Sequence, residues 1–274
     1  MFKKIIGLTM ISFLFIVQVG CCVNNKYSKP KDVLNAEYLN FKLKNKNKIL
    51  HNQNFVFLTS FVMTRDSNNF NSICYVDEDK SDLCYDPLVP LTSASGYVVN
   101  VNKEKINVLT AAHWCKTLNT EDIMDATGLI FEKDPLVGMY ATFMGNDYLI
   151  EKKPIMNEKD DLCLIEFESK FYKYAKNMKV ANKAPDIGEE IYAISAPQWS
   201  HEDEIRQHYQ GKFAGCNSHE CSFTIPATFG SSGSSVINGK GEIVSIIAKA
   251  AVDFNNLAVG PKPEAIKQFL KENL

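Results

Sequence analysis

Three short stretches of the sequence each hold a residue that can transfer a proton or attack a carbonyl carbon. In "INVLTAAHWC" an apolar run leads into His113, in "KDDLCLIEF" Asp161 directly precedes one, and in "FGSSGSSVIN" Ser232 stands before a glycine. Imidazole can act as a general base, a half-buried carboxylate can fix the tautomer of that imidazole, and a serine in a tight glycine turn can be a nucleophile. The order His, Asp, Ser therefore predicts acyl-transfer chemistry.

Each motif also has a simpler interpretation when it is taken alone. A lone histidine at a strand end is usually structural, paired aspartates are typical of a charged turn, and Gly/Ser-rich hairpins are common. We select Asp161 over Asp160 because Asp161 adjoins the apolar run. Together, the spacings of 48 residues from His113 to Asp161 and 71 residues from Asp161 to Ser232 suit a triad divided between two barrels.

The same stretches resemble the three signature blocks of the trypsin-like serine proteases, which have the chymotrypsin fold. "LTAAHWC" is similar to the histidine block, "DDLCLI" to the aspartate block and "GSSGSSVINGKGEIVSI" to the serine block. "SASGYVV", "IGEEIYAISAP" and the C-terminal segment also resemble family elements, so the likeness extends over roughly residues 54–274. The chain resembles the bacterial branch, with its glutamyl endopeptidases and high-temperature-requirement proteases, more than the digestive trypsins.

This resemblance implies a role for each residue of the three blocks. Ser232 attacks the scissile carbonyl, His113 takes its proton and later gives it to the leaving amine, and Asp161 orients His113. The backbone N–H groups of Gly230 and Ser232 form the oxyanion hole. The residues expected to bind substrate are Ala227, Ile247, Ala248, Lys249 and Ala250.

Departures from the family pattern refine these expectations. Ser231 replaces the aspartate that meets a new N-terminal ammonium in trypsins, so we expect no activation of that kind. Pro226 stands where trypsins have an acidic residue at the base of the specificity pocket, which argues against a preference for Lys or Arg. The strand expected to pair with substrate, 247–250, also lacks the histidine of the glutamyl enzymes. We therefore expect an apolar pocket for a small or medium side chain.

Short segments rich in β-branched and aromatic residues make up most of the chain after Asn54. Only "KPEAIKQFLKENL" has a clear helical pattern, with Pro263 near its start. This pattern predicts an all-β fold, which the resemblance specifies as two six-stranded Greek-key β-barrels with a C-terminal α-helix. The expected organisation is a signal peptide 1–20, a flexible segment 21–53 and a peptidase domain 54–274, divided into barrels 54–178 and 179–260 and a helix 263–274.

The N-terminus has the tripartite pattern of a secretory signal: lysines, an apolar run from Ile5 to Val17, and small residues before a cysteine pair. The run is short for a spanning helix and polar sequence follows, which favours export over a membrane anchor. Val19-Gly20-Cys21 resembles the end of a bacterial lipobox, whereas Gln18 departs from it. Lipidation of Cys21 and ordinary cleavage both stay open, and we expect a periplasmic or extracellular protein, with or without a lipid anchor.

The eight cysteines fit an oxidising compartment. Two polar loops are each bracketed by cysteines, which favours hairpin disulfides that pair Cys74 with Cys84 and Cys216 with Cys221. A zinc site is the alternative at the second loop, which contains His219, but no further pair stands at finger-like spacing. Cys115 and Cys163 either bond to each other or are buried thiols, and the sequence leaves both states open.

The composition is that of an ordinary globular protein, with 45% hydrophobic and 23% charged residues. A net charge of -2 gives no reason to propose a nucleic acid as partner, and no metal or other cofactor is expected. We expect the protein to be a serine endopeptidase that cleaves a polypeptide substrate through an acyl-enzyme. The alternative is a catalytically silent binding or adhesion protein with a protease fold, and the presence of His, Asp and Ser together argues against it.

Overall fold

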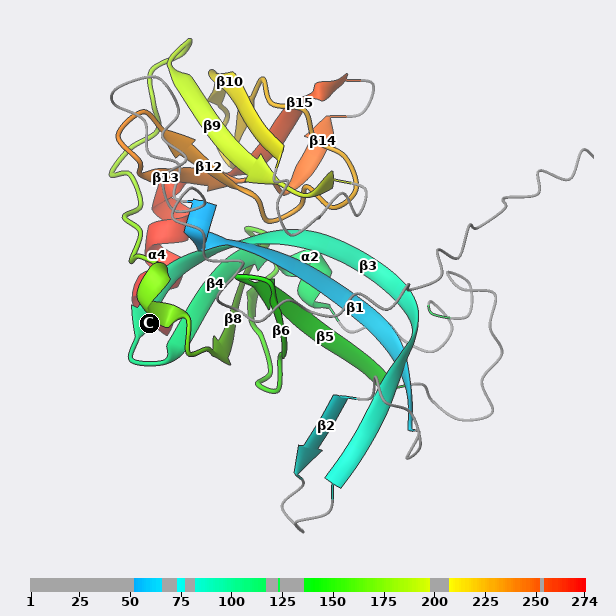
Figure 1. Ribbon diagram of the computed structural model, residues 1–274. Coiled ribbons are helices and arrows are strands. Elements are labelled where there is room, and N and C mark those ends of the chain that lie inside the picture. Colours follow the sequence, from blue (N-terminus) through cyan, green and yellow to red (C-terminus); the bar gives the residue numbers. More distant parts are fainter. Residues whose placement is uncertain are drawn as a thin grey trace, which may run out of the picture. The chain divides into compact units, whose positions relative to one another are not determined.

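The computed structural model describes residues 52–65, 73–76, 82–116, 123, 136–197, 207–251 and 254–274 (Figure 1). All of these residues belong to one compact unit, Ala36–Leu274. The predicted signal peptide, Cys21 and nearly all of the predicted flexible segment lie outside the described residues. No helix among the described residues is long and apolar enough to cross a membrane.

The first sheet is built from the N-terminal part of the described chain. Its eight strands are β1 (Phe55–Arg65), β2 (Ile73–Val76), β3 (Asp82–Asn102), β4 (Lys105–Ala111), β5 (Leu136–Phe143), β6 (Asn146–Leu149), β7 (Ile155–Asn157) and β8 (Leu162–Glu168). They follow the order β6-β5-β1-β3-β4-β8-β7, and β2 pairs with β3 outside this path. The central strands β4 and β8 are almost wholly buried, as expected of continuous apolar runs.

The second sheet is built from the C-terminal part of the chain. Its seven strands are β9 (Glu190–Ser195), β10 (Gln207–Cys216), β11 (Glu220–Phe223), β12 (Ser235–Asn238), β13 (Ile243–Ile246), β14 (Lys249–Ala251) and β15 (Phe254–Pro261). They follow the order β13-β12-β9-β10-β11-β15-β14. Among the described strands β14 therefore lies at the end of this sheet, with strand β15 on one side only.

The helical elements whose bounds the structure describes are three short turns and one terminal helix. The turns are η1 (Asn52–Asn54), α2 (Ala112–Cys115) and η2 (Tyr172–Tyr174), and the helix is α4 (Pro263–Asn273). Proline in the first turn of α4 fits the helix start, where its missing N–H costs nothing. The predicted all-β fold with a C-terminal helix is confirmed. The sheets have eight and seven strands rather than six each, because short strands such as β2 and β7 pair at their margins.

The main hydrophobic core lies where the two sheets and α4 meet. It combines side chains of both sheets and of the helix, among them Phe55, Tyr97, Leu109, Ile194, Ile237, Ile266 and Phe269. A second hydrophobic cluster is formed by side chains of the second sheet and its adjoining segments, with Ile191, Phe213, Phe223 and Val236 among its members. Because β4 and β12 contribute to one shared core, packing fixes the segments that follow β4 and precede β12 relative to each other.

Of the two predicted hairpin disulfides, one is present. The other involves two cysteines whose side chains the structure does not describe. Cys216 and Cys221 lie opposite each other in the β10–β11 ladder and form a disulfide, as predicted. The backbones of Cys74 and Cys84 lie opposite each other in the β2–β3 ladder, but their side chains lie outside the described part of the chain.

A further disulfide joins Cys115 of α2 to Cys163 of β8, with 6.6 Å between the Cα atoms. This bond resolves the choice that the sequence left open. Each of its cysteines stands two positions after a candidate catalytic residue, His113 or Asp161. The bond therefore ties together the two chain segments that carry these residues.

Replacing both cysteines of this bridge (Cys115→Ala with Cys163→Ala) is expected to lower the free energy of unfolding. The bridge spans a sequence separation of 48 residues, for which loop-closure entropy predicts a loss of about 4 kcal/mol. The Cys216–Cys221 bridge spans a separation of 5 residues and is the matched control, with an expected loss of about 2 kcal/mol. Chemical denaturation of the oxidised proteins measures both losses. Equal losses, or a larger loss from the short bridge, would contradict this account.

Candidate active site

His113 lies in α2, the single turn that follows β4, and Asp161 binds both its backbone and its ring. The His113 N–H donates to Asp161 Oδ1 over 2.8 Å, and His113 Nδ1 lies 2.8 Å from Asp161 Oδ2. The N–H of the adjacent Ala112 donates to the Asp161 carbonyl oxygen over 3.1 Å. A carboxylate only accepts hydrogen bonds, so it favours the tautomer with hydrogen on Nδ1 and leaves Nε2 as the proton acceptor.

Asp161 has an unusual backbone conformation at the last position before β8. Its φ of 52° lies in the left-handed region, which costs a non-glycine residue roughly 1–2 kcal/mol and is adopted most readily by Asp and Asn. The preceding turn is stabilised by Asn157, whose side chain donates to Asp160 Oδ2 over 2.9 Å and accepts the Asp160 N–H over 3.2 Å. Asp160 is therefore a turn residue, and Asp161 is the carboxylate that faces His113.

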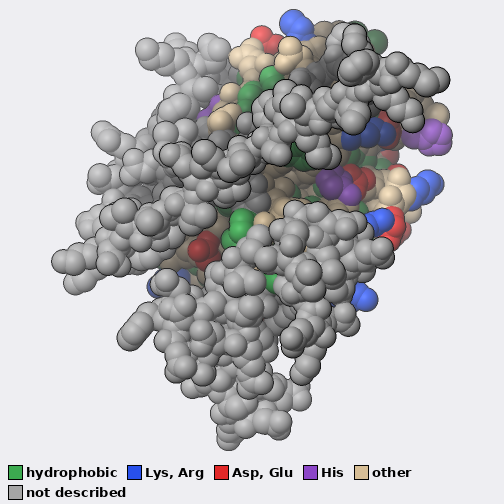
Figure 2. Space-filling view, turned by 90° about the vertical axis from the view of Figure 1, so that its right-hand side faces the viewer, with side chains coloured by type: hydrophobic (Ala, Val, Ile, Leu, Met, Phe, Trp, Pro, Cys, Tyr) green, Lys and Arg blue, Asp and Glu red, His purple; other side chains and the backbone are tan. Residues whose placement is uncertain are grey.

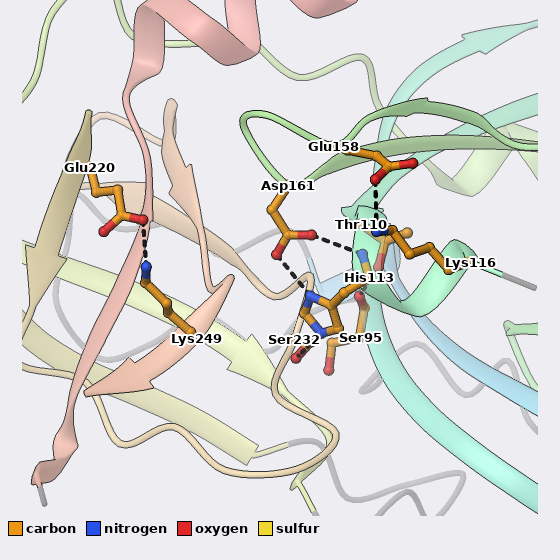
Figure 3. Close-up of polar contacts among 9 residues, drawn as sticks. All are labelled: Ser95, Thr110, His113, Lys116, Glu158, Asp161, Glu220, Ser232 and Lys249. Atoms are coloured by element: carbon orange, nitrogen blue, oxygen red, sulfur yellow. Dashed lines mark hydrogen bonds and ion pairs between the residues drawn. The ribbon is translucent and has the colours of Figure 1, made fainter. Parts of the chain in front are cut away.

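Ser232 completes a chain of hydrogen bonds that crosses from one sheet to the other. Its Oγ lies 2.9 Å from His113 Nε2 (Figure 3). The side chains of His113 and Asp161 are 47% and 28% exposed, so solvent reaches the ring more easily than the carboxylate. Figure 2 shows a face on which a histidine and several charged side chains reach the surface together. The structure thus brings together the three residues that the sequence motifs indicate.

Glycines on both sides of Ser232 give the serine turn its shape. Gly230 has a φ of 87° and Gly233 a φ of 83°, values that glycine adopts without steric cost. Gly233 is also packed closely, because a Cβ at this position would overlap the Ser95 carbonyl oxygen and Thr110 Oγ1. These two atoms are hydrogen-bonded to each other over 2.8 Å. The serine turn can therefore lie directly against the first sheet, beside His113.

The N–H groups of the serine turn alternate between bonded and unbonded. The Ser231 N–H donates to the Thr228 carbonyl oxygen over 2.9 Å, and the Gly233 N–H donates to the Ile247 carbonyl oxygen over 2.8 Å. The N–H groups of Gly230 and Ser232 have no hydrogen-bond partner among the described residues. Two unpaired N–H groups two positions apart are the kind of donors that an oxyanion hole requires.

Ser231 points into the protein and is 1% exposed. Its Oγ accepts the Thr228 N–H over 3.3 Å, and its own N–H donates to the Thr228 carbonyl oxygen over 2.9 Å. The buried side chain at this position therefore closes its own turn and offers no carboxylate to an N-terminal ammonium. The absence of trypsin-type activation stays a prediction.

A cavity of about 870 Å³ opens beside the His113–Ser232 pair. It is lined by four of the five residues predicted to bind substrate, namely Ala227, Ile247, Lys249 and Ala250. Ala248 does not line it.

The cavity has further walls that the sequence motifs do not indicate. Trp114 and Phe229 line it, and Phe229 is 89% exposed directly before Gly230. Both residues adjoin motif residues, so their position in the sequence is a usable signal. Val137 and Met139 of β5 also line it, but β5 reaches the site only by pairing with β1. No local pattern could have indicated these two residues.

Two ion pairs flank the cavity (Figure 3). Lys249 Nζ lies 2.6 Å from Glu220 Oε1, and Lys116 Nζ lies 2.7 Å from Glu158 Oε2. All four side chains are substantially exposed, so each pair contributes at most about 1 kcal/mol to stability. Their main effect is to compensate the charge of the two lysines that line the cavity.

Comparison with known proteins gives matches at the level of structure. No family model and no curated protein matches the sequence. The Rv3671c protease from M. tuberculosis, in its active form, is similar with a TM-score of 0.50 and 9% identity, over 80% of this chain and 80% of that chain. The serine endoprotease from Yersinia pestis is similar with a TM-score of 0.51 and 14% identity, over 82% of this chain and 66% of that chain.

These likenesses show the fold of the chain. Two β-sheets in succession and a closing helix form the chymotrypsin-like two-barrel fold of the trypsin-like serine proteases. At identities of 9% and 14% the comparisons show nothing beyond the fold. Any argument about function therefore rests on the residues of the site.

Changing Gly233 to alanine is expected to lower the free energy of unfolding by at least about 2 kcal/mol. The new Cβ would overlap backbone and side-chain oxygens of the first sheet, and its φ of 83° is unfavourable for alanine. Gly239→Ala is the matched control, because no heavy atom lies within 4 Å of its Cβ position, and its effect should stay within about 0.5 kcal/mol. Thermal and chemical denaturation measure both. Similar losses in the two variants would contradict the close approach at Gly233.

Proposed function

We propose that the protein is a trypsin-like serine endopeptidase, with Ser232 as nucleophile, His113 as general acid and base, and Asp161 as the orienting carboxylate. The observation that carries the proposal is the hydrogen-bond chain through these residues, with distances of 2.8 Å and 2.9 Å at the two ring nitrogens of His113. Both distances suit proton transfer between a nucleophile and its base. The protease fold of the chain supports the same function.

The proposed reaction has two halves that use the same groups. Ser232 Oγ attacks the carbonyl carbon of the scissile bond while its proton passes to His113 Nε2. The C–N bond then breaks, His113 gives the proton to the leaving amine, and an acyl-enzyme remains on Ser232. Water, deprotonated by His113, attacks the ester carbon. The bond between this carbon and Ser232 Oγ then breaks, His113 returns the proton to Oγ, and the acid product leaves. In both halves Asp161 stabilises the imidazolium that forms.

The oxyanion of each tetrahedral intermediate is assigned to the N–H groups of Gly230 and Ser232. Both lack other partners within the described chain, so they can donate hydrogen bonds to the oxyanion without first breaking an existing one. Loss of one such donor typically costs 10²–10³-fold in rate, or about 3–4 kcal/mol. The φ of 87° at Gly230 is therefore a functional as well as a steric requirement.

The proposed substrate is a polypeptide with a small or medium apolar side chain at the cleavage site. Ala227, Ile247 and Ala250 provide apolar walls for the cavity beside Ser232. Among the described strands β14 has a neighbour on one side only, and this edge supports pairing with an extended peptide. Among relatives, we place the protein with the bacterial branch of the family, although Ile247 and its neighbours include no histidine of the glutamyl-enzyme kind.

Export from the cytoplasm is part of the proposal. The two disulfides among the described residues form readily only in an oxidising compartment. The signal-like N-terminus supports the same location, either periplasmic or extracellular. A lipid on Cys21 would keep the protein at a membrane surface.

A fluorophosphonate probe tests the nucleophile. We expect the purified protein to be labelled covalently and Ser232→Ala to lose all label, because the probe reacts only with an activated serine. Ser231→Ala is the matched control and should keep the label, since the Ser231 side chain is buried and its Oγ accepts a hydrogen bond from the Thr228 N–H. Mass spectrometry of the adduct identifies the modified residue. An unlabelled wild type, or label lost only in Ser231→Ala, would contradict the assignment.

Cell fractionation tests the lipid anchor. A lipid on Cys21 predicts that the wild type collects with membranes and that Cys21→Ala moves to the soluble exported fraction, because the acyl chains provide the attachment. Cys22→Ala, which leaves Cys21 in place, is the control and should behave as the wild type. If Cys21→Ala stays with the membranes, or if the wild type never collects there, the anchor is wrong and ordinary cleavage is supported.

A further inference from the structure

One buried residue of β3, Ser95, contacts several parts of the candidate site. Its side chain is 0% exposed. Its N–H donates to the Ser232 carbonyl oxygen over 2.8 Å, and its Oγ donates to the Gly230 carbonyl oxygen over 2.8 Å. Its own carbonyl oxygen accepts Thr110 Oγ1 over 2.8 Å, three positions before His113. Figure 3 shows Ser95 beside Ser232 and His113.

The direction of the Ser95 hydroxyl hydrogen follows from its two partners. The Ala196 N–H donates to Ser95 Oγ over 3.1 Å, so a lone pair of the oxygen is already used. A carbonyl oxygen can only accept, so the single hydroxyl hydrogen must point to Gly230. The Ser95 hydroxyl therefore accepts a hydrogen bond from Ala196, directly after β9 of the second sheet, and donates one to the carbonyl oxygen of Gly230.

These contacts fix two peptide groups of the serine turn at both ends. In the Gly230–Ser231 peptide, the oxygen accepts from Ser95 and the N–H donates to Thr228. In the Ser232–Gly233 peptide, the oxygen accepts from the Ser95 N–H and the N–H donates to the Ile247 carbonyl oxygen, between β13 and β14. The unpaired N–H groups of Gly230 and Ser232 belong to the peptides that alternate with these. Their directions are therefore set by neighbours that cannot rotate.

We propose that Ser95 is a positioning residue whose hydroxyl keeps the two oxyanion N–H groups aimed at one point. The proposal rests on the proposed peptidase function and goes beyond its triad, because the hydrogen bonds of Ser95 within the described residues involve neither the His113 ring nor Ser232 Oγ. Without the hydroxyl, the buried Gly230 carbonyl oxygen loses its donor, and an unpaired buried carbonyl favours rotation of its peptide toward another partner. Glycine at position 230 offers little resistance to that rotation.

The test compares Ser95→Ala with Ser234→Ala in the full-length protein. Ser234 is the matched control, because its hydroxyl is also buried near the nucleophile but makes no hydrogen bond among the described residues. The fluorophosphonate reaction is followed over time at several probe concentrations, which separates the maximal labelling rate constant from the probe concentration at half-maximal rate. End-point labelling gives the fraction of competent protein, so that loss of folded protein is not counted as loss of rate.

Ser95→Ala is expected to lower the maximal labelling rate constant by about 10-fold or more, somewhat less than the loss of a whole oxyanion donor. The half-maximal probe concentration and the pH dependence of the rate should match the wild type, because the hydrogen bonds of Ser95 within the described residues do not involve the His113 ring. Ser234→Ala should label as the wild type does. Ser95→Cys retains the size of the side chain with a weaker donor, and its rate should fall between those of Ser95→Ala and the wild type.

Three outcomes overturn the role of Ser95. They are an unchanged rate constant in Ser95→Ala, a wild-type rate in Ser95→Cys if Ser95→Ala does not fold, and an equal slowing of Ser95→Ala and Ser234→Ala. In each of these the wild type still reacts, so the proposed peptidase function stands. If the wild type itself is not labelled, the peptidase function fails, and with it the reaction that Ser95 would serve.

Discussion

The hydrogen bond from the Ser95 N–H to the Ser232 carbonyl oxygen joins the first sheet directly to the serine turn of the second. It can form because β4 leaves β3 at this point. The β3–β4 ladder ends at the pair Tyr97–Leu109, after which the chain turns into α2. The edge of β3 thus left free receives the serine turn, and Gly233, which has no side chain, allows the two backbones to meet.

The two sheets contribute different parts of the proposed chemistry. The first sheet assembles the proton-transfer pair by itself, since Asp161 forms two hydrogen bonds with His113 and a third with the neighbouring Ala112 N–H. The Cys115–Cys163 bond holds the same two segments covalently. The second sheet provides the nucleophile and the unpaired N–H groups. Correct docking of the sheets is therefore the step on which the whole site depends.

Features that depend on local sequence could be predicted, and features that depend on long-range pairing could not. The all-β class, the terminal helix and the Cys216–Cys221 disulfide follow from periodicity and spacing, and they are confirmed. The choice of His113, Asp161 and Ser232 came from their residue types, order and spacing together with the block resemblance, and the structure places the three side chains within hydrogen-bonding distance.

The elements that escaped prediction are those fixed by register. Cys115 meets Cys163 only because β4 pairs with β8 so that Thr110 lies opposite Cys163. Ser95 contacts Gly230 across 135 positions of sequence, and "SASGYVV" contains no local mark of that contact. The margin strands that raise the counts above six are three or four residues long, too short for an alternating pattern to identify.

Under the proposed peptidase function, the position of β14 at the end of its sheet, as far as the described strands extend, would limit what the protein can cleave. An edge strand hydrogen-bonds only to a chain that is itself extended, so a bound segment must lie straight along Lys249–Ala251, over roughly 10 Å. A helix or a packed sheet cannot present its backbone in that way. Natively folded proteins would then resist cleavage except at termini, at long loops or after local unfolding. Conformation, as much as side-chain identity, would determine the choice of substrate.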